Sequence, residues 1–122
     1  MFDFRKLRIW QHGQEVTVAV YQLTRHFPKD ELFGLTSQLR RSAGSVPHNI
    51  AEGCGRLSKP DLLRFLTIAM GSASELESQL LLAQALGYSS TEAIEALLSD
   101  VVRLRKMLAA YYQKVKGSQG AE

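Results

Sequence analysis

Apolar residues recur at intervals of three and four along most of the chain, which is the spacing of one face of an α-helix. In the first segment these positions are Ile9, Gly13, Val16, Val20, Leu23 and Phe27. Their heptad-like spacing is typical of a helix packed at a shallow angle in a bundle. We expect this helix to run from Asp3 or Phe4 to His26, because Pro28 pushes the residue before it out of the α region.

The second segment, Glu31 to Arg56, has the same periodicity but contains a proline. Its apolar face comprises Leu32, Leu35, Leu39, Ala43, Val46 and Ile50. Pro47 lies in phase with this face, where it removes one backbone hydrogen bond and crowds the preceding turn. We predict one helix kinked at Pro47, with Asp30 as N-cap and a left-handed C-cap at Gly53 and Gly55. The same two glycines would also suit an anion-binding nest, but their short spacing favours the C-cap.

Two further helices are predicted from serine capping signatures. The string Ser58-Lys-Pro-Asp61 has a serine N-cap, an early proline and an acid in the first turn. The helix that follows should run to Leu86, where Gly87 stops it. The string Ser89-Ser-Thr-Glu92 is a second capping box.

The last helix should end at Lys116, and its apolar residues again alternate in steps of three and four. They are Ile94, Leu97, Val101, Leu104, Leu108, Tyr111 and Val115. Four long helices joined by short loops make neighbouring helices antiparallel. The sequence therefore predicts an all-α, up-down-up-down four-helix bundle over residues 1–116, followed by a disordered tail at 117–122.

The third helix is apolar on more than one side. Its core face comprises Leu62, Leu66, Ala69, Ala73, Leu76, Leu80 and Ala83. A second side carries Phe65, Ile68, Leu82 and Leu86. A helix that is apolar nearly all round is buried on more than one side, and a domain of four helices offers too little cover for that. We therefore predict a homo-oligomer with these four residues in the interface.

Two strings carry a resemblance to a known family. GLTSQLRRSAGSVPHNIAEG, which ends at Gly53, and GSASELESQL, which ends at Leu80, resemble the small bacterial "four helix bundle protein" family. The first described members of that family are encoded by intervening sequences in large-subunit rRNA genes. The chain is also similar to the accessory variability protein of diversity-generating retroelements. The resemblance extends from about Phe4 to Tyr112. It implies an antiparallel bundle, a ring-shaped pentamer, binding of RNA or DNA without catalysis, and a partner protein such as a reverse transcriptase.

Composition places the chain among soluble single-domain proteins. It has 122 residues, of which 45% are hydrophobic and 22% are charged, and no apolar run is long enough to span a bilayer. The N-terminus lacks a signal-peptide core, and a single cysteine, Cys54, excludes an internal disulfide. We expect a cytoplasmic protein that is not associated with a membrane.

The net charge is +3, and the basic residues are unevenly distributed, since Lys and Arg are absent from residues 65–102. The candidate phosphate-binding residues are Arg40, Arg41, Arg56, Lys59 and Arg64. Two other basic clusters are Arg5, Lys6 and Arg8, and Arg103, Arg105 and Lys106. No exposed aromatic residues are interleaved with them, so we expect phosphate contacts with little sequence preference. Simple solvation of helix faces is the alternative, and the protein would then be a protein-interaction scaffold.

No motif indicates catalysis, a metal or another cofactor. The Glu-x-x-His pairs of di-iron bundles are absent, and His48 and Glu52 have no evident third ligand. Cys54 has no base within reach on the same helix side. Glu77 lies near the core stripe and is expected either to pair with Arg40 or Arg41 or to reach water at the stripe's edge.

Overall fold

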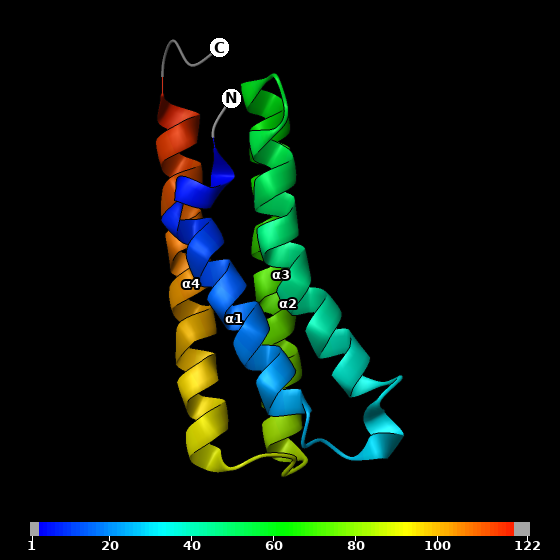
Figure 1. Ribbon diagram of the computed structural model, residues 1–122. Coiled ribbons are helices and arrows are strands. Elements are labelled where there is room, and N and C mark those ends of the chain that lie inside the picture. The colour runs from blue at the N-terminus through cyan, green and yellow to red at the C-terminus, as the bar shows by residue number, and fades with distance from the viewer. Residues whose placement is uncertain (1–2, 119–122) are drawn as a thin grey trace.

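The computed structural model describes residues 3–118 and contains four α-helices. They are α1 (Arg8–Thr24), α2 (Leu35–Cys54), α3 (Lys59–Ala85) and α4 (Thr91–Gly117). Two short 3-10 helices, η1 (Phe4–Lys6) and η2 (Lys29–Glu31), precede α1 and α2. Every regular element in the described part of the chain is therefore helical, and the predicted all-α four-helix fold is confirmed (Figure 1).

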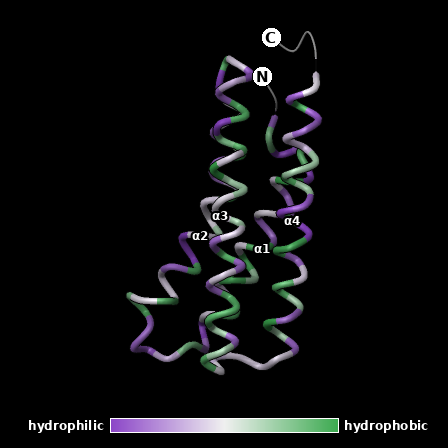
Figure 2. The backbone as a smooth tube through the Cα atoms, turned by 180° about the vertical axis from the view of Figure 1, so that it is seen from behind, coloured by the Kyte–Doolittle hydropathy of each residue, from purple (hydrophilic) through white to green (hydrophobic). Residues whose placement is uncertain are grey.

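The helices pack in a ring, each against two others. The α1 helix packs on α2 and α4, and α3 packs on the same two helices from the other side. The start of α1, the α2–α3 connection and the end of α4 lie at one end of the molecule, and the α1–α2 and α3–α4 connections lie at the other (Figure 1). Figure 2 shows the same arrangement from behind.

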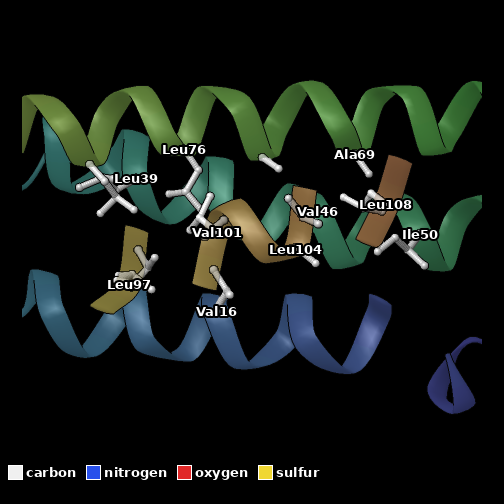
Figure 3. Packing of buried hydrophobic residues seen from close by; sticks show 14 of the residues in the cluster. Val16, Leu39, Val46, Ile50, Ala69, Leu76, Leu97, Val101, Leu104 and Leu108 are labelled. Carbon is white, nitrogen blue, oxygen red and sulfur yellow. The ribbon is translucent and has the colours of Figure 1, made fainter. Parts of the chain in front are cut away.

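The core lies between the four helices and is built from the periodic apolar positions. The largest fully buried aliphatic side chains are Leu39, Ile50, Leu66, Leu76, Leu80, Ile94, Leu104 and Leu108. Figure 3 shows ten labelled residues of this cluster, which come from all four helices and point toward one another. Apolar burial of this kind is the main favourable term in folding, and here it follows the pattern of the sequence.

The α2 helix is continuous through Pro47. The proline is buried, and a β-carbon built at Gly13 of α1 would lie 3.5 Å from its Cδ. The region from Gly44 to Asn49 is thus helical and not an extended loop. The first turns of α2 lean outward from the other helices in Figures 1 and 2. A kink localised at Pro47 stays a prediction.

The prediction for the start of α2 is wrong. The α-helix begins at Leu35 instead of Glu31, and Asp30 lies in η2 and does not cap it. The N-cap residue is Gly34, which has no side chain, and the Glu31 carboxylate satisfies the first helical amide instead, since its Oε1 accepts a hydrogen bond from the Leu35 amide at 3.1 Å. Its Oε2 accepts a second hydrogen bond from the Tyr88 hydroxyl at 2.8 Å. One side chain thus caps α2 and ties it to the connection between α3 and α4.

Glu31→Ala is expected to lower the melting temperature of the protein at neutral pH. The hydrogen bonds from Leu35 and Tyr88 lower the pKa of Glu31, so its contribution is present above the ordinary glutamate pKa and is lost as the pH falls through the lowered value. The melting temperatures of wild type and variant should therefore differ at pH 7 and differ less at an acidic pH below the lowered pKa of Glu31. A difference that is the same at both pH values would show that the charge of Glu31 is not involved.

Gly55 is the C-cap residue of α2, as predicted, but the left-handed conformation predicted for it is wrong. Gly55 has φ −85°, in the right-handed region, and Gly87 is the one residue with positive φ among residues 3–118. Gly53 is needed for a different reason. A β-carbon there would lie 3.0 Å from Leu62 Cδ1 and Phe65 Cβ, so its absence lets α2 approach α3 closely.

The prediction for the start of α1 is wrong as well, because the α-helix begins at Arg8 instead of Asp3 or Phe4, and residues Phe4–Lys6 form η1. The remaining helix ends agree more closely with prediction. Ser58 Oγ accepts a hydrogen bond from the Asp61 amide and caps α3 as predicted, and Gly87, at φ 70°, follows its last turn. The α4 cap lies one residue later than predicted, at Ser90 in place of Ser89. The α1 helix ends at Thr24, two residues before the predicted end.

Of the predicted tail, Gly117 ends α4 and Ser118 is its C-cap. Residues 119–122 lie outside the described residues, as do residues 1 and 2.

Candidate nucleic-acid interface

The five predicted phosphate-binding residues do not form one patch. Arg40 packs between α1 and α2, where its Nε donates to Thr24 Oγ1 at 2.9 Å and its guanidinium lies 4.7 Å from the Tyr21 ring centroid. Arg41 is exposed and lines a polar hollow of about 290 Å³ that also contains Glu75 of α3. Arg40 is thus held within the domain by a hydroxyl and a ring, and Arg41, which forms no ion pair among residues 3–118, shares its hollow with an acidic residue.

Arg56 and Arg64 are brought together by Phe65. Their guanidinium carbons lie 4.9 Å and 4.4 Å from the centroid of its ring. Each also binds a carboxylate, since Arg56 pairs with Glu52 at 2.8 Å and Arg64 with Asp61 at 3.7 Å. Both charges are thus partly neutralised by exposed ion pairs, which are weak but reduce the attraction for phosphate.

Lys59 is engaged by the end of α4. Its Nζ donates to the backbone carbonyl of Ser118 at 2.8 Å and to that of Lys116 at 3.4 Å. This contact fastens the start of α3 to the end of α4 and suits the partial negative charge of a helix C-terminus.

A groove between the start of α1 and the second half of α4 collects positive charge that is not neutralised. We call it the α1–α4 groove; its volume is about 590 Å³, and its lining residues are Lys6, Leu7, Arg8, Ile9, Arg103, Met107, Ala110, Tyr111 and Lys114. All four of its basic residues are exposed, and none forms an ion pair or a side-chain hydrogen bond within residues 3–118.

The α1–α4 groove unites two clusters that are almost a hundred residues apart in sequence. Lys6 and Arg8 belong to the N-terminal cluster, and Arg103 belongs to the cluster on α4. Of the neighbouring basic residues, Arg5 binds Asp3 at 2.9 Å and Arg105 binds Glu77 at 3.2 Å. Both clusters could be identified in the sequence, but their placement side by side could not. Lys114 was not a candidate, because a lysine in the last turn of a helix is expected from the helix dipole alone.

The partner predicted for Glu77 is wrong, since it is Arg105 of α4 instead of Arg40 or Arg41 of α2. The Glu77 side chain is 27% exposed, so the residue both pairs and reaches water at the edge of the core. Phe65, which was predicted to lie in the oligomer interface, is 9% exposed, with Arg56 and Arg64 lying over its ring, so it offers little surface to a second subunit. The other three predicted interface residues, Ile68, Leu82 and Leu86, are 41%, 50% and 49% exposed.

The candidates for chemistry, His48, Glu52 and Cys54, all lie in the second half of α2. Cys54 is 2% exposed, and burial raises the pKa of its thiol, which keeps it protonated at neutral pH. His48 is exposed on α2, and the Glu52 carboxylate is bound by Arg56. Within residues 3–118, no group of three or more His, Cys, Asp and Glu side chains could hold a metal ion. None of the described helices has the length and apolar character required to cross a membrane.

Comparison with known proteins places the fold in a family. A solved structure from Bacteroides thetaiotaomicron, a protein of unknown function from the S23 ribosomal protein family, is 25% identical to the chain with a TM-score of 0.77. The match covers 85% of this chain and 97% of that one. No curated protein matches the chain. The family model described as 23S rRNA-intervening sequence protein matches residues 5–110, and the chain therefore belongs to this family.

Proposed function

We propose that the protein is a non-enzymatic, homo-oligomeric nucleic-acid-binding protein that acts as an accessory or assembly factor in the cytoplasm. The observation that carries the proposal is the α1–α4 groove, with four exposed cations that lack partners among the described residues. Unpaired Lys and Arg side chains gathered in a groove are the electrostatic footprint of phosphate binding.

The distribution of acidic residues supports binding of nucleic acid at the end of the bundle where α1 begins. Residues 65–102, which lack Lys and Arg, form most of α3 and the first half of α4. Glu92 and Glu95 lie in the first turns of α4, at the end of the bundle opposite the α2–α3 connection (Figure 1). The bundle is therefore polarised along its axis, and a polyanion is attracted toward the end where α1 begins.

The proposed oligomer is a pentamer, as the family resemblance implies. Its physical support is the exposed apolar side chains of Ile68, Leu82 and Leu86 on α3, which neither α2 nor α4 covers. Repetition of the α1–α4 groove in each subunit would multiply a modest charge into a strong field. A reverse transcriptase is the kind of partner protein that the resemblance suggests.

The test of nucleic-acid binding is its salt dependence. We expect the wild-type oligomer to bind RNA and DNA at low salt, with log affinity falling linearly with log salt by roughly 0.9 per neutralised phosphate on duplex DNA. Arg8→Ala with Arg103→Ala should weaken binding to all sequences and reduce the slope by roughly two for each bound groove. Fluorescence anisotropy with a labelled duplex, at a series of salt concentrations, measures both quantities.

The matched control is Arg25→Ala with Lys29→Ala. It removes the same charge from exposed residues that follow α1, at the opposite end of the bundle, and should leave the slope unchanged. Equal losses in the two double variants would show that net charge matters and the groove does not. No binding by the wild type at low salt would reject this function in favour of a protein-interaction scaffold.

A further inference from the structure

A hollow of about 560 Å³ lies at the end of the bundle where α2 connects to α3. We call it the end pocket; its apolar walls come from α2, α3, α4, the residue before α1 and the α2–α3 connection, and they include Leu7, Cys54, Leu57, Leu62, Tyr111 and Val115. Leu7, Tyr111 and Lys114 line both this pocket and the α1–α4 groove. The two depressions therefore share one wall, with an aromatic ring and a cation in it.

The buried walls of the end pocket are apolar, and its charged lining residues are all cations, namely Arg56, Lys59 and Lys114. Leu62 and Cys54 are 7% and 2% exposed. Burial raises the pKa of the Cys54 thiol and that of the Tyr111 hydroxyl, so both groups are neutral at physiological pH. Neither the end pocket nor the α1–α4 groove has an Asp or Glu among its lining residues. An anionic ligand would therefore meet no like charge along either wall.

An apolar pocket beside a row of cations fits a polymeric ligand in which apolar and anionic units alternate. A lipid or a small carboxylate would use one cation, whereas the four cations of the α1–α4 groove suit successive phosphates. The volume lies within the range of pockets that enclose small ligands. Tyr111 offers a ring for stacking at the point where the two depressions meet, as single-strand-binding proteins do.

We propose that the end pocket receives one unpaired base of a single-stranded RNA or DNA whose phosphates lie along the α1–α4 groove. The inference rests on the proposed nucleic-acid binding and deepens it. A base inside a duplex is held in its stack and cannot enter, so the protein discriminates against fully paired strands. Recognition depends on stacking and apolar contact, which every base can provide, and sequence preference is weak.

The experiment compares a short single strand with a blunt duplex at the same salt concentration, using RNA and DNA forms of each. Tyr111→Ala should reduce affinity for the single strand by about tenfold and leave affinity for the duplex unchanged. Tyr111→Phe keeps the ring and should bind like the wild type. Tyr112→Ala is the matched control, because Tyr112 is also partly buried against the core but lines neither depression.

A second variant and a second readout keep the test independent of folding defects. Ser118→Trp places a large side chain at the edge of the end pocket and leaves all four groove cations in place. In the wild type, 2-aminopurine within the single strand should change its fluorescence on binding, and in Ser118→Trp it should not. Wild-type binding to the duplex as tight as to the single strand, or equal losses for both in Tyr111→Ala, would overturn the base pocket. Absence of binding to either would instead reject the proposed function itself.

Discussion

Leu82→Glu combined with Leu86→Glu is expected to convert the assembly into monomers. Light scattering of the wild type at micromolar concentration should give a mass several times 13.6 kDa, and the variant should give 13.6 kDa. The two leucines are one helical turn apart and about half exposed, so they lie on the same uncovered face of α3. Burying two carboxylates without partners in a subunit interface costs more free energy than the apolar contact provides.

The matched control for this pair is Val18→Glu with Gln22→Glu on α1. These residues have the same spacing and add the same charge, and both are exposed on a different helix. The control should keep the mass of the wild type. A wild type that is monomeric at this concentration would contradict the oligomer, and dissociation of the control alone would place the interface on α1. Phe65 is not a useful site for this test, because it is already buried within one subunit, under Arg56 and Arg64.

Leu76→Ala is expected to lower the free energy of unfolding by about 2–5 kcal/mol. Leu76 is fully buried in the middle of α3, where it lies close to core residues of the other helices in Figure 3. Truncation removes buried apolar atoms and leaves a cavity that rigid neighbouring helices cannot fill completely. Denaturation by urea, at the same protein concentration for every variant, measures the loss.

Leu57→Ala is the control for the cavity, since it makes the same chemical change at a side chain that is 92% exposed. It should change the free energy of unfolding by less than about 0.5 kcal/mol. If the two variants lost the same stability, the core around Leu76 would not be packed as Figure 3 shows.

The number and type of elements could be read from the sequence, because both depend on local patterns. Periodic apolar positions predicted four helices. The capping signature at Ser58 predicted the start of α3 correctly, since the Ser58 side chain caps that helix. The continuity of α2 across Pro47 was also predicted, because Pro47 lies in phase with the apolar face of the helix. These features are determined by residues within a few positions of one another.

The features that could not be predicted depend on which helix covers which side of its neighbour. A helical projection correctly placed Ile68, Leu82 and Leu86 outside the core, but it could not show that the close approach of Gly53 lets α2 cover Phe65. It placed Glu77 at the core's edge but could not choose Arg105 as its partner. Such pairs join residues far apart in the chain, and their contact exists only after the helices have packed.

The same division applies to the candidate site. The sequence by itself determined that the chain carries several basic clusters and an acidic stretch without Lys or Arg. Only the tertiary structure decided which cations gather, since Arg40 is bound by Thr24 of α1, and Lys6 and Arg8 lie beside Arg103 only in the packed bundle. It also decided that Tyr111 lies between that groove and the end pocket. The physical reason is that helix formation is local, whereas grooves and pockets are made by surfaces that meet only when α1 and α4 lie side by side.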